Sequence, residues 1–126
     1  MKRIESEPTR VTPFISFDPD EGILEMRGRS SPENAIQFYT ELIQSLTDFA
    51  DSNYPELVAS FAFEYFNTST SKCLFDIFKR LVKVRNNGKD LYINWFYEEE
   101  DEDMMEAGED YSDLLDLEFN FIEIVE

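Results

Sequence analysis

Residues 61 to 72 read Phe61-Ala62-Phe63-Glu64-Tyr65-Phe66-Asn67-Thr68-Ser69-Thr70-Ser71-Lys72. An apolar and aromatic run ends there in an asparagine and four consecutive hydroxyl residues, and a helix-patterned segment, residues 73–82, follows at once. The pattern predicts a buried strand that leads directly into a helix. Backbone N–H groups without helical partners and the positive end of the helix dipole lie at such a junction.

The hydroxyl cluster has two interpretations. Asn, Ser and Thr are the usual N-cap residues, so capping alone explains one or two members of the cluster. A helix N-terminus can also accommodate a phosphate, which makes the junction a candidate phosphorylation switch. Taken by itself, the local pattern favours capping, because caps are far commoner than switches.

Strand and helix patterns alternate on both sides of this junction. Two short strands, residues 13–18 and 23–28, form a predicted hairpin around a Pro- and Gly-containing turn. Ser31 and Pro32 are typical of a helix start, and the apolar residues that recur at helical spacing after them are Ile36, Tyr39, Ile43, Leu46 and Ala50. Further elements are expected at residues 57–66 (strand), 73–82 (helix), 91–97 (strand), 104–115 (helix) and 119–125 (strand).

The element order predicts an α/β fold, ββαβαβαβ, in a single domain that covers residues 1–126 with a loosely packed start at residues 1–11. Strands separated by helices form parallel pairs, so the sheet should be mainly parallel with the N-terminal hairpin at its edge. The near-continuous apolar run of residues 57–66 indicates an interior strand that is covered on both faces. Ligands and partners of such sheets gather at the carboxyl ends of the strands, where the hydroxyl cluster lies.

Composition limits the function. The chain has 126 residues, 42% hydrophobic content and twelve Phe, which argue against disorder despite a net charge of −17. That charge opposes binding to nucleic acid and to anionic membranes. The chain contains no histidine, one cysteine and four glycines outside any phosphate-binding motif, so neither an enzyme, a cofactor nor a metal site is expected. Without an apolar spanning segment or a secretory signal, the expected location is the cytoplasm.

Residues 98–110 form an acidic run, with nine Asp or Glu and no Lys or Arg. The favoured interpretation is a solvated turn and helix start, where acidic side chains suit the helix dipole. A surface for a basic partner, including mimicry of DNA, is the alternative. A calcium site is not expected, because the spacing departs from the calcium-loop pattern.

Three segments together resemble the SiaC family of bacterial regulatory phosphoproteins. They are residues 64–72, the acidic motif of residues 94–110, and residues 12–19 with the later Ser31-Pro32-Glu33-Asn34. The resemblance extends over nearly everything from residue 12 to residue 126, and the long acidic motif makes it specific. It implies a fold like that of STAS domains, which include bacterial anti-sigma-factor antagonists.

The resemblance also implies a switch. STAS domains carry a phosphorylatable hydroxyl directly after an acidic or amide residue where a strand meets its helix, which points to Thr68 as acceptor. Ser69, Thr70 and Ser71 are weaker candidates, and the residues that flank the switch are Tyr65, Phe66, Asn67 and Lys72. In this family a serine/threonine protein kinase modifies the protein and a metal-dependent phosphatase reverses the modification. The unphosphorylated form activates a diguanylate cyclase, in cyclic-di-GMP and biofilm signalling.

Two alternatives to this function stay open. One is a partner switch of the anti-sigma-antagonist kind. The other is an acidic decoy or scaffold that acts through charge alone.

Overall fold

The computed structural model describes residues 1–125, in which strands and helices alternate after an initial run of three strands. Their order is β1 (Ile4–Ser6), β2 (Phe14–Asp18), β3 (Ile23–Ser30), α1 (Ala35–Ala50), β4 (Glu56–Phe66), α2 (Thr68–Asn86), β5 (Asp90–Glu98), α3 (Glu102–Leu115) and β6 (Phe119–Ile124). The predicted α/β fold is therefore confirmed, with one additional strand at its start.

The six strands form one sheet in chain order, from β1 to β6. Antiparallel pairing joins β1 to β2 and β2 to β3, and the pairs from β3 to β6 are parallel. β4 lies between β3 and β5, which confirms that the strand leading to the hydroxyl cluster is interior. The N-terminal hairpin is confirmed, but β1 takes the edge position.

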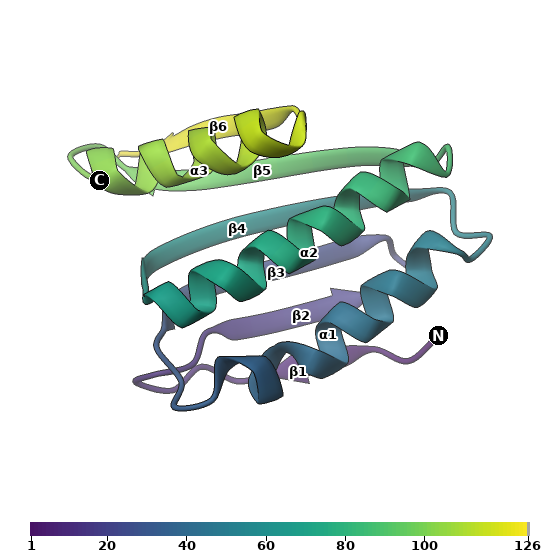
Figure 1. Ribbon diagram of the computed structural model, residues 1–126, viewed down its shortest axis with the longest axis horizontal. Coiled ribbons are helices and arrows are strands. Elements are labelled where there is room, and N and C mark those ends of the chain that lie inside the picture. Colours follow the sequence, from purple (N-terminus) through teal and green to yellow (C-terminus); the bar gives the residue numbers. More distant parts are fainter. Residues whose placement is uncertain (126) are drawn as a thin grey trace.

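All three helices lie on the same face of the sheet (Figure 1). Each new parallel strand is added on the same side of the preceding one, and right-handed connections then place every helix on one face. Burial follows this arrangement along β4, because Leu57, Ala59, Phe61 and Phe63 are buried while the residues between them are partly exposed. The prediction that this strand is covered on both faces is wrong.

The core between the helices and the sheet is aromatic around Trp95. The indole ring has neighbouring ring centroids at 6.0 Å (Phe61), 6.1 Å (Phe78), 6.1 Å (Tyr111) and 6.0 Å (Phe119). Trp95 Nε1 donates a hydrogen bond to the Met104 carbonyl at 2.9 Å, which satisfies the one polar atom of this buried side chain. The central strands and the second and third helices are thus held by one cluster.

The start of the chain differs from the sequence-based expectation. Residues 1–11 were expected to pack loosely, but Ile4–Ser6 forms β1 and pairs with Ile15–Phe17 of β2. Ile4 is partly buried against the core. A strand this short is marginal by itself and forms because β2 offers it hydrogen-bonding partners.

The beginning of α1 also differs. Asn34 is its N-cap, with Oδ1 accepting a hydrogen bond from Gln37 N at 3.1 Å, so the helix starts three residues after the predicted Ser31 and Pro32. Ile36 was expected on the apolar face but is 76% exposed. The buried residues of α1 are Ala35, Tyr39, Leu42, Leu46, Phe49 and Ala50, so Tyr39, Leu46 and Ala50 are buried as expected and Ile43 is partly buried.

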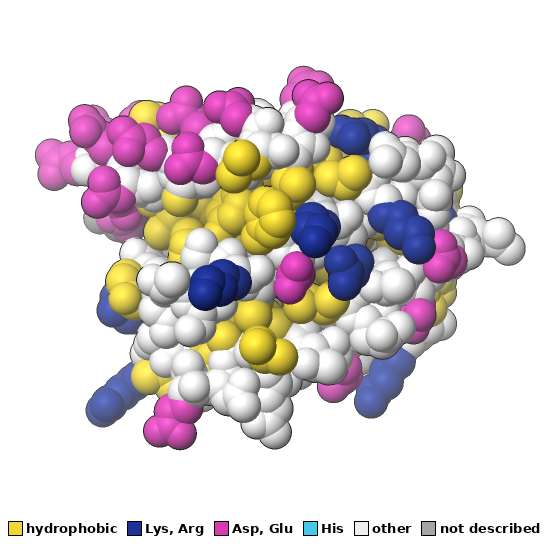
Figure 2. All heavy atoms as spheres, in the orientation of Figure 1, with side chains coloured by type: hydrophobic (Ala, Val, Ile, Leu, Met, Phe, Trp, Pro, Cys, Tyr) yellow, Lys and Arg dark blue, Asp and Glu magenta, His cyan; other side chains and the backbone are white. Residues whose placement is uncertain are grey.

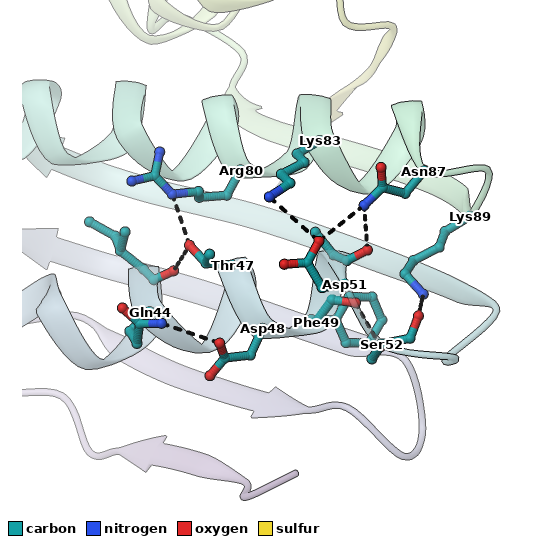
Figure 3. Close-up of polar contacts among 12 residues, drawn as sticks. Gln44, Thr47, Asp48, Phe49, Asp51, Ser52, Arg80, Lys83, Asn87 and Lys89 are labelled. Carbon is teal, nitrogen blue, oxygen red and sulfur yellow. Dashed lines mark hydrogen bonds and ion pairs between the residues drawn. The ribbon is translucent and has the colours of Figure 1, made fainter.

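Polar contacts join the C-terminal halves of α1 and α2 (Figure 3). Arg80 Nε donates to Thr47 Oγ1 at 3.0 Å, and Asn87 Nδ2 donates to the Ala50 carbonyl at 2.6 Å. Lys89 is buried and its ammonium donates to the Ser52 carbonyl at 2.5 Å. These contacts fix the end of the helix pair that is remote from the hydroxyl cluster.

Candidate functional site

The strand-to-helix junction is formed by a single residue, Asn67. Its side-chain Oδ1 accepts a hydrogen bond from Thr70 N at 2.9 Å, and its extended backbone (φ −85°, ψ 177°) is that of an N-cap. Asn67 N donates to the Ser30 carbonyl at 3.0 Å, which ties the cap to the end of β3. The helix begins at Thr68, earlier than the predicted segment of residues 73–82, so Thr68 lies at the helix start and the capping role belongs to its neighbour.

The structure separates the four hydroxyl residues into two pairs. Thr68 and Ser69 are exposed at the first two positions of α2. Thr70 is fully buried, and Ser71 is partly buried. Thr68 and Ser69 are therefore open to solvent, whereas Thr70 and Ser71 are wholly or partly withdrawn from it.

Thr70 belongs to a buried chain of hydroxyl groups beneath the junction. Its Oγ1 lies 2.8 Å from Ser30 Oγ and donates to the Ser30 carbonyl at 3.2 Å. Ser30 Oγ in turn lies 2.6 Å from the hydroxyl of Tyr39. Burial raises the pKa of Tyr39 to about 12, although the hydrogen bond with Ser30 acts in the opposite direction. The chain links α1, β3 and α2 at one point.

Ser71 connects α2 to α3. Its Oγ lies 2.8 Å from the hydroxyl of Tyr111, and that hydroxyl also donates to the Ser71 carbonyl at 2.9 Å. Burial raises the pKa of Tyr111, which remains the neutral donor at neutral pH. The Ser71 hydroxyl is therefore engaged in holding the two helices together.

The residues that flank Thr68 in the sequence include aromatic and cationic side chains. Tyr65 is 43% exposed, and the guanidinium of Arg29 lies 5.1 Å from its ring centroid. Phe66 is partly buried against Phe63, at a centroid distance of 5.5 Å. Lys72 is exposed one turn after Thr68, and neighbouring side chains at this spacing share a helix face.

Sequence reasoning missed three residues that shape the site: Ser30, Tyr39 and Arg29. Ser30 lies 40 residues before Thr70, and the two meet only because β3 and β4 are parallel neighbours. Arg29 reaches Tyr65 for the same reason, since the two residues are partners in register. A prediction of strand pairing would have been the signal for Ser30 and Arg29, whereas Tyr39 lies on α1 and reaches Ser30 through helix packing.

The acidic run forms the turn before α3 and the first part of that helix. Asp101 is the N-cap, with Oδ1 accepting from Met104 N at 3.0 Å, and Glu102 and Asp103 lie in the first turn. This confirms that the run is a turn and helix start with mostly exposed side chains. A surface for a basic partner stays a prediction. Within residues 1–125, no group of His, Cys, Asp and Glu side chains has an arrangement that could hold a metal ion. Nor does any helix in this range have the length and apolar character to cross a membrane.

Comparison with known proteins identifies relatives over nearly the full length. Residues 6–124 match the SiaC family, described as SiaC family regulatory phosphoprotein. An uncharacterized protein of Pseudomonas aeruginosa strain UCBPP-PA14 is 29% identical over 103 residues, which are 82% of each chain.

Solved structures with the same fold include SiaC of Pseudomonas aeruginosa. The crystal structure of apo-SiaC has a TM-score of 0.85 and 26% identity, over 99% of this chain and 100% of that chain. A chain in the crystal structure of the diguanylate cyclase SiaD in complex with its activator SiaC has a TM-score of 0.88 and 27% identity. The match covers 96% of this chain and 99% of that chain. Both likenesses therefore cover nearly the whole chain.

Proposed function

This chain belongs to the SiaC family of regulatory phosphoproteins, and on that premise we propose that it is a binding protein switched by phosphorylation at Thr68. In the proposed cycle the unphosphorylated form binds and activates a diguanylate cyclase, and the phosphorylated form does not. The SiaC of Pseudomonas aeruginosa, an activator found in complex with the cyclase SiaD, supports the choice of partner.

The observation that carries the proposal is the position of Thr68. Its hydroxyl is exposed at the first residue of α2, while Asn67 supplies the cap and the hydroxyls of Thr70 and Ser71 are engaged in interior contacts. Thr68 can therefore gain or lose a phosphate without a change in the hydrogen bonds that hold the junction. Ser69 is the second accessible hydroxyl and Thr68 is preferred because it directly follows the amide residue.

The proposed chemistry needs two enzymes. A serine/threonine kinase transfers the γ-phosphoryl group of ATP to Thr68 Oγ1, which loses its proton, and ADP leaves. A metal-dependent phosphatase hydrolyses the ester, which returns the hydroxyl and releases inorganic phosphate. The protein itself supplies no catalytic group in this cycle, and we expect it in the cytoplasm, where the kinase finds ATP.

The physical effect of the phosphate is local. It adds about −1.5 to −2 charges and three acceptor oxygens at one point of a chain whose net charge is already −17. A partner that packs around the unmodified hydroxyl would have to bury or displace this dianion, which costs free energy unless the partner places a cation there. The helix start itself tolerates the charge, because an anion suits its dipole.

Thr68→Ala tests the acceptor assignment. The purified variant is incubated with the serine/threonine kinase and ATP, and intact mass is compared with the wild type and with the matched control Ser69→Ala. We expect Thr68→Ala to gain no phosphate and still to bind the cyclase, and Ser69→Ala to be modified normally. Full modification of Thr68→Ala would exclude the assignment.

A second function, an acidic decoy or scaffold, is favoured by one observation. α3 contains six acidic residues and no Lys or Arg, and acidic side chains crowd its outer surface (Figure 2). The dependence of partner affinity on salt concentration distinguishes the two functions. A complex formed by charge alone should weaken steeply as ionic strength rises, whereas a packed interface should weaken much less.

A further inference from the structure

The sheet ends at β6, whose outer edge has no strand beside it. β6 is the last strand in the order from β1 to β6, and its six residues pair in parallel with β5. Within residues 1–125, no other strand and no loop backbone group pairs with the outward N–H and C=O groups of residues 119–124. Figure 1 shows β6 at one extreme of the sheet, with α3 beside it. A row of backbone donors and acceptors is therefore open to another strand.

β6 lacks the features with which proteins commonly protect edge strands. Those features are short length, proline, lysine and β-bulges. Residues 119–124 contain neither proline nor lysine, and their register with β5 is continuous over all six residues. The opposite edge is protected, because β1 has three residues and Arg3 beside it forms ion pairs with Glu5 and Asp18. Of the two edges of the sheet, β6 is the one that can accept a further strand.

The side chains of β6 alternate between two chemically different faces. Phe119 and Phe121 lie on the helix side, where their ring centroids are 5.8 Å apart and both contact the core. By alternation Ile122 and Ile124 lie on the uncovered face, and Ile124 is 36% exposed. Ile122 pairs in register with Phe96 of β5, which is partly exposed on the same face. An added strand would therefore place every second side chain beside apolar neighbours.

Acidic residues surround this edge. Residues 98–126 contain fourteen of the chain's 28 Asp and Glu, and no Lys or Arg. Glu123 lies in β6 on the helix side, as the register partner of Tyr97, and α3 presents further carboxylates on its outer surface (Figure 2). A second copy paired through the same edge would bring two such acidic ends together, and like charges repel. Charge therefore disfavours self-pairing and favours a basic strand.

We propose that β6 accepts a basic β-strand of another protein, which extends the sheet by one strand. Backbone hydrogen bonds to β6 supply the affinity, as in other complexes formed by strand addition. Alternation supplies the specificity. Lys or Arg side chains of the added strand face Glu123 and α3, and Val or Ile side chains lie beside Ile122 and Ile124 on the uncovered face. β5 separates this edge from β4 and Thr68, so the interaction is additional to the proposed phosphorylation switch.

A synthetic peptide of alternating lysine and valine, about eight residues long, is the probe. It is titrated into the isotope-labelled full-length chain at about 0.15 M salt, where exposed charges are screened beyond about 8 Å. We expect the amide shifts to concentrate in β6, and the amides of β6 to become protected from hydrogen exchange. Two control peptides keep the charge: one groups its lysines at one end, and in the other every backbone nitrogen is methylated and cannot donate. Both should bind about tenfold more weakly or worse.

Two matched pairs of variants locate the binding on the chain. Ile124→Lys adds the residue type that protects natural edges, and Ile36→Lys makes the same change at a side chain that is 76% exposed on α1. Glu123→Lys reverses a charge on the edge, and Glu41→Lys reverses one at an exposed position of α1. We expect both β6 variants to weaken peptide binding about tenfold or more, and both α1 variants to stay within about threefold. Circular dichroism checks that each variant is folded.

Other results would overturn the proposal. Equal binding of the three peptides, or equal weakening by the β6 and α1 variants, would mean that the peptide responds to net charge alone. Amide shifts that avoid β6 would place the peptide elsewhere on the chain. A wild-type dimer in sedimentation that Ile124→Lys abolishes would assign the edge to a second copy. The experiment contains neither cyclase nor kinase, so its result is independent of the proposed function.

Discussion

Gly108 of α3 packs directly on the indole of Trp95 in β5. A Cβ at this glycine would lie 2.6 Å from both Cδ1 and Nε1 of the indole, closer than van der Waals contact allows. The Trp95 hydrogen bond to the Met104 carbonyl, four residues earlier in the same helix, fixes the ring at this distance. The pair sets how closely α3 approaches the sheet, and with it the position of the acidic residues on the outer side of that helix.

Gly108→Ala should therefore destabilise the protein. Overpacking of a closely packed core costs about 1–3 kcal/mol, while the better helix propensity of alanine returns up to about 1 kcal/mol. We expect a net loss on the order of 1 kcal/mol in urea unfolding, together with a shift in the fluorescence of Trp95, the only tryptophan. Glu109→Ala, an exposed change one residue away, is the control and should change stability far less.

Asn67→Ala should cost more stability than Thr68→Ala. Asn67 holds the cap hydrogen bond to Thr70 N, so its loss is expected to cost about 0.5–2 kcal/mol. Thr68 is exposed and makes no such contact within residues 1–125, so its replacement should cost clearly less. Thermal unfolding of the two variants side by side measures the difference. The reverse order of stability would mean that Thr68 and not Asn67 supports the helix start.

Thr68→Glu should weaken cyclase binding only in part. A single carboxylate carries one charge and two oxygens, whereas a phosphate carries about −1.5 to −2 charges and three acceptor oxygens. Calorimetry should rank the affinities as wild type, then Thr68→Glu, then the phosphorylated protein. Thr40→Glu, at an exposed threonine of α1, controls for the added charge. Equal weakening by both changes would indicate a response to net charge and not to position.

Alkaline pH should destabilise the fold through Tyr39. Its pKa is raised by burial from 10.0 to about 12, so the folded state favours the neutral phenol. This stabilising contribution is fully present below pH 10 and is lost as the pH rises from 10 toward 12, by about 1.4 kcal/mol per pH unit. The free energy of unfolding of Tyr39→Phe should fall less steeply over this range. Tyr92→Phe, at a 56% exposed tyrosine, should keep the slope of the wild type.

Much of the architecture could be predicted because apolar periodicity decides it locally. A helix start beside the hydroxyl cluster followed from an aromatic run that ends in cap residues, although the helix begins at Thr68 and not at residue 73. β1 could not be predicted, because Ile4-Glu5-Ser6 carries one apolar residue and becomes a strand only beside β2. Ser31 and Pro32 have the residue types of a helix start, but Ser31 N donates to the Val11 carbonyl and Asn34 makes the cap hydrogen bond, so α1 begins later than the pattern predicts.

The uncovered face of the sheet and the separation of the hydroxyls depend on contacts that are remote in sequence. Val58 and Ala62 make the apolar run of β4 almost continuous, so the sequence does not distinguish one covered face from two. The hydroxyl of Thr70 is hydrogen-bonded to Ser30, and that of Ser71 to Tyr111. Each partner is 40 residues away in the sequence. Four adjacent hydroxyl residues therefore differ in solvent exposure, and no local sequence pattern predicts which of them are buried.

The separation of the capping residue from the residue proposed to be modified has a consequence for the amount of the protein in the cell. Because the residue that caps the helix, Asn67, and the residue proposed to be modified, Thr68, are different, each round of modification would leave the cap hydrogen bond in place and change the folding equilibrium little. Proteases that degrade unfolded chains would then act equally on the phosphorylated and unphosphorylated forms. The total amount of protein would stay constant while the fraction of the active form varied. The signal would be set by the relative rates of the kinase and the phosphatase, and it could be reversed repeatedly without new synthesis.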